Sequence, residues 1–84
     1  MPRYYFHLFN DVTALDEEGL ELPNDAVALQ RGAENARAMA AQSVSEGHLI
    51  MDHRIEVEND EGQTVGTVYF RDVVKVVESG TASR

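Results

Sequence analysis

The pattern that decides the fold of this chain is a long amphipathic stretch from Asp25 to about Glu46. Small apolar residues recur in it at spacings of three and four, which places them on one side of an α-helix. They are Ala26, Leu29, Ala33, Ala36, Ala40 and Val44. Asn24 is suited to cap the first turn, and Gly47 to the left-handed conformation that ends a helix. Because the stripe is mostly alanine and Gly32 lies near it, we expect the helix to pack closely on a sheet.

Patterns typical of β-strands lie on both sides of this helix. Residues 3–9 are rich in aromatics and form a strand pattern, and residues 12–16 can complete a hairpin with them. Residues 54–58 alternate apolar and charged side chains, and residues 64–70 form the return strand after a turn that contains Gly62. The order β-β-α-β-β predicts an α+β fold, in which an antiparallel sheet of about four strands carries one long amphipathic helix on one face.

The length of 84 residues fits one domain. We expect residues 1–77 to form that single α+β domain. Residues 78–84 are small and polar, and we expect them to form a disordered carboxy-terminal tail.

Charge and composition narrow the partners of this domain. The chain has fifteen acidic and seven basic residues, for a net charge of −8, and the basic residues are scattered along it. Nucleic acids and anionic membranes attract clustered Lys and Arg, so we expect neither as a partner. The sequence has no cysteine, no apolar run long enough to span a bilayer and no signal segment. We therefore expect a cytoplasmic protein.

One helix can cover only one face of the predicted sheet, and the strands carry large side chains toward both faces. We expect the uncovered face to hold a candidate interaction surface. Its residues are Tyr5, His7, Phe9, Val65 and Tyr69. Exposed aromatic surface favours association, so the first hypothesis is a homodimer that buries this face. Alternatives are a small apolar ligand, another protein partner, cover by the carboxy-terminal segment, or tyrosines that tolerate solvent.

The sequence contains no recognisable catalytic pattern. It lacks a nucleophile elbow and a phosphate-binding glycine loop, so we expect a protein that is not an enzyme and has no cofactor. A metal site that uses His48 and His53, with Asp52 between them in the sequence, and His7 as a third ligand is conceivable, but the spacing matches no known ligand pattern. The acidic residues 16–18 lack the alternating ligands of a calcium loop. We therefore predict no catalytic, cofactor-binding or metal-binding residues.

Several short stretches together resemble a family of small bacterial proteins known only as a domain of unknown function. They are Pro2 to Leu8 (PRYYFHL), Asp16 to Gly19 (DEEG), Leu22 to Asn24 (LPN), Ala36-Arg37, Ile55 to Val57 (IEV) and Asp60 to Gln63 (DEGQ). The resemblance covers about residues 2–75 and implies the same small bacterial α+β domain, but no activity. Helices of that family tend to carry more Leu and Glu than this one.

A second resemblance suggests a different partner. The strand pair, the acidic turn, Leu22-Pro23 and the helical stretch Glu34-Asn35-Ala36 are similar to the amino-terminal half of HicB-type antitoxins. That resemblance implies a basic, RNA-cleaving protein as the partner. An acidic chain suits such a partner, because opposite fields accelerate association.

Overall fold

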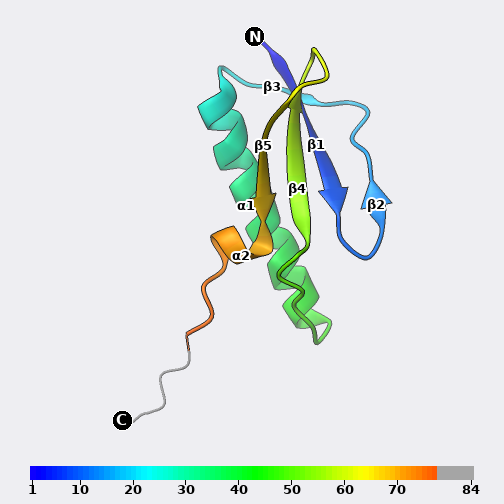
Figure 1. The fold of residues 1–84 in the computed structure, drawn as a ribbon, viewed down its shortest axis with the longest axis vertical. Helices are drawn as coiled ribbons and strands as arrows, with labels where there is room; N and C mark the ends of the chain where they lie inside the picture. Colours follow the sequence, from blue (N-terminus) through cyan, green and yellow to red (C-terminus); the bar gives the residue numbers. More distant parts are fainter. Residues whose placement is uncertain (78–84) are drawn as a thin grey trace.

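A computed structural model describes residues 1–77 and has the predicted α+β architecture (Figure 1). An antiparallel sheet of five strands carries one long helix on one face, which confirms the predicted fold class. The elements are β1 (Arg3–Phe9), β2 (Thr13–Ala14), β3 (Leu20–Glu21), α1 (Asp25–Ser45), β4 (Arg54–Asn59), β5 (Thr64–Tyr69) and α2 (Phe70–Val73). The predicted tail, residues 78–84, lies outside the described residues.

The strands run in the order β2-β1-β4-β5, and β3 also pairs with β1. One edge of the sheet is therefore divided between two strands of two residues each, with Ala14 opposite Leu8 and Leu20 opposite Tyr4. The strand expected over residues 12–16 is thus shorter, and β3 was not predicted. The other edge is formed by β5, a strand of six residues.

Asp16 supplies hydrogen-bond acceptors where this edge is divided. It lies between β2 and β3, and its Oδ2 accepts a hydrogen bond from the backbone N–H of Phe6 at 3.1 Å. Its Oδ1 accepts from the N–H groups of Glu18 and Gly19, each at 3.1 Å. The carboxylate replaces the missing strand residue as acceptor, and Gly19 completes the turn at a φ of 71°.

The helix begins and ends where the sequence predicts. The Asn24 side chain accepts a hydrogen bond from the N–H of Val27 at 2.9 Å, which satisfies one free donor of the first turn. Gly47 follows the last turn at a φ of 95°, the left-handed conformation typical of this position. Over residues 1–77, no helix combines the length and the apolar character needed to cross a bilayer.

The buried side of α1 differs from the predicted stripe by a rotation about the helix axis. The residues buried on it are Ala28, Gly32, Ala36, Ala40 and Ser43. Ala26 and Val44, which the sequence placed in the stripe, are exposed. The seam, which is the line of contact between α1 and the sheet, is closest at two glycines. A Cβ on Gly32 of α1 would lie 3.1 Å from Val57, and one on Gly66 of β5 would overlap Leu29. The helix therefore settles over β4 and β5 along these two glycines.

The face beneath α1 holds the core of the domain. Its most buried side chains include Tyr4, Ile55, Val57, Val68 and Phe70. The Tyr4 hydroxyl donates a 2.6 Å hydrogen bond to Oδ1 of Asp25 in the first turn of α1, so it fastens β1 to the start of the helix. This hydrogen bond, with burial and the nearby negative charge, raises the pKa of Tyr4 to about 12.

Candidate functional site

The sheet face opposite α1 is the candidate site, and we call it the open face. In Figure 1 the strands lie in front of α1, so this face points toward the viewer. No described helix covers it, because α1 packs on β4 and β5 from the other side and α2 packs on α1 and β5.

The strand register arranges the open face in three rows across β1, β4 and β5. The basic row holds Phe9, Arg54 and Tyr69, the middle row holds His7, Glu56 and Thr67, and the acidic row holds Tyr5, Glu58 and Thr64. The two outer rows are named after their residue on β4, which is Arg54 in the basic row and Glu58 in the acidic row. Arginine thus marks one end of the face and glutamate the other.

Four of the five residues predicted for this surface lie on the open face. Tyr5, His7, Phe9 and Tyr69 are all half-buried there. Val65 is the exception, since it is the unmatched residue at the irregularity in the β4–β5 pairing. Its side chain packs against the core beneath α1, so we leave it out of the open face.

Arginine side chains stack on two aromatic rings of the basic row. The guanidinium carbon of Arg54 lies 4.4 Å from the centre of the Phe9 ring, and that of Arg71 lies 4.9 Å from the centre of the Tyr69 ring. The Nε of Arg54 also donates to Glu56 at 3.1 Å. These contacts are cation–π interactions, in which the positive charge of the guanidinium is attracted to the face of a half-buried ring.

His7 links the open face to the divided edge. Its Nδ1 accepts a hydrogen bond from the backbone N–H of Asp16 at 3.1 Å, which assigns the ring proton to Nε2. Nε2 lies 3.3 Å from Oε1 of Glu58, to which it can then donate. Both ring nitrogens therefore have partners, and His7 acts as a structural link.

The acidic turn predicted at residues 16–18 contains one carboxylate that is committed to the fold. Burial acts to raise the pKa of Asp16, but hydrogen bonds from the backbone N–H groups of Gly19, Phe6 and Glu18 lower it overall. Asp16 is therefore held as a carboxylate by the backbone. Glu17 and Glu18 are exposed.

The three histidines lie at two separate places. His48 and His53 approach the same carboxylate, with Nε2 atoms 3.6 Å and 3.5 Å from the oxygens of Asp11. His7 lies on the open face, and Asp52 contacts Arg71 instead of the histidines. Within residues 1–77 there is no group of three or more His, Cys, Asp or Glu residues arranged to hold a metal ion.

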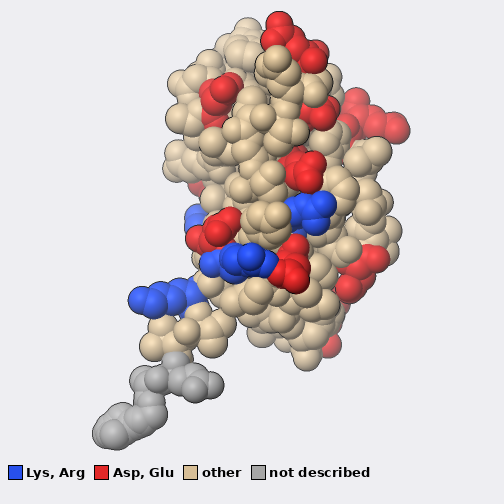
Figure 2. All heavy atoms as spheres, in the orientation of Figure 1, with Lys and Arg blue, Asp and Glu red and all other residues tan. Residues whose placement is uncertain are grey.

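The charged residues of β4 lie on the open face, but the surface predicted from the sequence did not include them. The alternation in residues 54–58 places Arg54, Glu56 and Glu58 on the same face of their strand, but their position between β1 and β5 depends on the strand order. Figure 2 shows this side of the molecule, with Lys and Arg atoms beside Asp and Glu atoms across its middle and further Asp and Glu atoms around the rim. The face is therefore a mixed aromatic and charged surface, and not a continuous aromatic row.

Comparison with known proteins places the sequence pattern in a family. A family model described as "Domain of unknown function (DUF6894)" matches residues 3–71. This match confirms the resemblance to a family known only as a domain of unknown function. Comparison with curated proteins and with solved structures gave no match.

Proposed function

Because the chain belongs to the DUF6894 family, whose description names no function, we propose a function from the geometry of its open face. The protein is a non-enzymatic interaction module that self-associates through this face. The observation that carries the proposal is the pairing of arginines with aromatic rings on a sheet face that no described helix covers.

The composition of the open face supports the proposal. Aromatic residues and arginine are enriched at protein interfaces, and they contribute most of the binding free energy there. Tyr5, Phe9 and Tyr69 supply three rings, while Arg54 and Arg71 lie over two of them. Arginines that already stack on these rings lose little side-chain freedom on binding, so the cost of association is reduced.

The charge distribution supports one orientation of the two copies. Arg54 and Glu58 lie at opposite ends of the central strand. A two-fold axis in the plane of the interface, perpendicular to the strands, sets the basic row of one copy against the acidic row of the other. A parallel arrangement brings like charges together, which disfavours it. We therefore propose an antiparallel, face-to-face dimer.

The size of the face limits the strength of the dimer. Six-residue strands are about 20 Å long, and the three strands of the open face, at about 4.8 Å each, are about 15 Å wide, so each copy contributes an area of about 300 Å². Stable complexes bury about 800 Å² from each partner, and we therefore expect a weak dimer that forms at high micromolar concentration. We propose that the protein acts in the cytoplasm, and the absence of cysteine is compatible with that compartment.

Charge reversal at the two ends of β4 tests the proposal. Arg54→Glu and Glu58→Arg each place like charges opposite one another in the dimer, and we expect either change to raise the dimer Kd about tenfold or more. The double variant restores opposite charges, so it should dimerise again. An equimolar mixture of the two single variants should form a heterodimer. Light scattering over a concentration series measures all four cases.

Matched controls separate this effect from net charge. Arg31→Glu on α1 and Glu61→Arg in the β4–β5 turn make the same charge changes at exposed positions away from the open face, and they should leave the dimer Kd unchanged. A wild-type protein that remains monomeric up to millimolar concentration, or single variants that dimerise like wild type, would contradict the proposal.

A second candidate is a basic protein partner, as the resemblance to antitoxins implies. The observation in its favour is the group of exposed carboxylates along the β2–β3 edge, which includes Asp11, Glu17, Glu18 and Glu21. Such a partner would be attracted by this edge, and binding would weaken with salt. Reversal of Glu17 and Glu18 to lysine should abolish such binding and leave the dimer intact, which separates the two candidates.

A further inference from the structure

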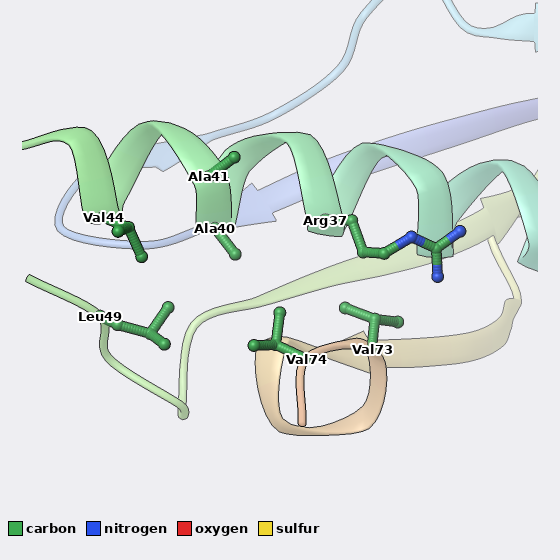
Figure 3. Close-up of a pocket in the computed structure, with 7 residues that line it drawn as sticks. All are labelled: Arg37, Ala40, Ala41, Val44, Leu49, Val73 and Val74. Atoms are coloured by element: carbon green, nitrogen blue, oxygen red, sulfur yellow. The ribbon is translucent and has the colours of Figure 1, made fainter. Parts of the chain in front are cut away.

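An apolar groove lies on the helix side of the molecule, away from the open face. It runs between the carboxy-terminal half of α1 and the segment around α2, and its volume is about 400 Å³. Its lining residues are Arg37, Ala40, Ala41, Val44, Leu49, Val73 and Val74. Figure 3 shows the helix side chains along one wall and the three residues of the later segments along the other.

The groove exists because the apolar side of α1 extends beyond the sheet. Arg37, Ala41 and Val44 follow one another at spacings of four and three, so they share one side of the helix, adjacent to the buried seam. Val44 is 58% exposed, although the sequence pattern places it among core residues. Leu49 and Val73 are half-buried against the core from the opposite wall. Both walls are therefore apolar, and no residue of the described chain fills the space between them.

Arg37 is the one charged residue that lines this groove. Four other basic residues of the described chain each form an ion pair, and they are Arg3 with Glu21, Arg31 with Glu34, Arg54 with Glu56 and Arg71 with Asp52. Within residues 1–77, no carboxylate lies at ion-pair distance from Arg37. Of the five arginines in residues 1–77, Arg37 alone has no carboxylate partner there, although the chain carries a net charge of −8.

We propose that the groove binds a free aliphatic carboxylate of medium chain length. The hydrocarbon chain lies between Ala40 and Val44 on one wall and Leu49 and Val73 on the other. The carboxylate pairs with Arg37, whose planar guanidinium can donate two parallel hydrogen bonds to it. A group the size of a water molecule occupies roughly 30 Å³. A groove of about 400 Å³ therefore has room for about ten carbons and a carboxylate. This binding is independent of the proposed dimer, because the open face lies on the other side of the sheet.

Titration with decanoate tests the proposal, with amide chemical shifts of labelled protein as the readout. The protein concentration is kept below that of dimer formation. We expect saturable shifts at Ala41, Val44, Leu49 and Val73. Hexanoate should bind at least tenfold more weakly, since each buried methylene contributes a factor of up to about four in affinity. Decylamine, which has the same chain and the opposite charge, should bind about tenfold more weakly or not at all.

Variants identify the two parts of the site. Arg37→Gln should weaken decanoate binding about tenfold and remove the preference for decanoate over decylamine, while Arg37→Lys should retain part of that preference. Val44→Asp should abolish decanoate binding, and Ala38→Asp, at an exposed position of α1 outside the groove, should leave it unchanged.

Three results would overturn the proposal. They are the absence of saturable shifts with decanoate, decanoate binding no tighter than that of decylamine, and wild-type affinity for decanoate in Arg37→Gln. If Val44→Asp abolishes self-association while decanoate leaves the spectrum unchanged, the groove holds a second copy of the chain instead. Circular dichroism of each variant establishes that the fold is retained in all of these comparisons.

Discussion

The two faces of this sheet are formed by the same strands but are stabilised in different ways. The covered face depends on close fit, since Gly32 lies against Val57, Gly66 lies against Leu29, and Phe70 is fully buried. Additional atoms have no room there, and removal of atoms leaves a cavity. The open face depends on pairs of side chains at half-exposed positions, which solvent can replace at small cost.

This difference separates stability from association. Because burial is concentrated on the covered face, we expect that face to supply most of the stabilisation and the half-exposed rings and charges of the open face to add little. Substitutions on the open face should therefore change the contact with a second copy while the fold is retained. Three substitutions test this separation, and the largest effect is expected on the covered face.

Phe70→Ala removes a ring that is 0% exposed and makes an edge-to-face contact with His53, with centroids 5.5 Å apart. We expect it to lower the free energy of unfolding by about 3–5 kcal/mol, the usual cost of such a cavity. A domain of this size has a total stability of roughly 4–12 kcal/mol, so the variant is expected to be largely unfolded or close to it.

Phe70→Leu serves as the milder variant, and it should remain folded with a smaller loss. Urea denaturation followed by circular dichroism measures both variants. If Phe70→Ala lost less than 1 kcal/mol, the covered face would not depend on close packing as described.

Asp16 lies at the border between the two faces, and its replacement should have an intermediate effect. Asp16→Asn supplies one acceptor oxygen instead of two, so at least one of the N–H groups of Phe6, Glu18 and Gly19 loses its partner. We expect a loss of about 1–3 kcal/mol near neutral pH, the cost of a buried donor left unsatisfied.

The effect of Asp16 should also depend on pH, because its pKa is lowered in the folded protein. Near pH 4 the unfolded chain, with an ordinary carboxyl pKa of about 3.9, binds more protons than the folded chain. The stabilisation is therefore complete above that pH and is lost as the pH falls through the lowered pKa. The difference between wild type and Asp16→Asn should shrink in acid. A constant difference from pH 7 to pH 3 would show that the charge of Asp16 contributes nothing.

The elements of this fold could be predicted from the sequence because their signals are local. Asn24 and Gly47 mark the ends of α1, and the turn around Gly62 marks the β4–β5 hairpin. Gly32 was expected to bring the helix close to the sheet, and it does so against Val57. Caps, turns and alternation depend on residues that are neighbours in the sequence, so their outcome does not require knowledge of the tertiary structure.

The remaining features depend on contacts between distant residues. The division of the edge into β2 and β3 requires Asp16 to reach the N–H of Phe6, which no local pattern indicates. The rotation of α1 is set by Gly66 beneath Leu29, so Val44 lines the groove and not the core. The charges of β4 lie at the centre of the open face only because β4 pairs with both β1 and β5.

Phe9→Ala makes the same chemical change as Phe70→Ala, but on the open face, and should have the smallest effect of the three on the folded monomer. Phe9 is half-buried, and its main contact is the guanidinium of Arg54 at 4.4 Å. A cation–π contact at an exposed site is worth about 0.5–1 kcal/mol, so we expect a loss of about 1 kcal/mol in dilute solution.

The concentration dependence of that loss distinguishes a ring that supports the fold from one that supports the dimer. A ligand or second copy that binds only the folded chain raises its stability by mass action, so wild type should become more stable as its concentration rises. Phe9→Ala, which lacks a ring of the proposed interface, should gain less, and the gap between the two proteins should widen with concentration. Thermal unfolding at micromolar and millimolar protein measures this gap. A loss near 3 kcal/mol in dilute solution, or a gap that is constant with concentration, would place Phe9 with the core and remove the distinction between the faces.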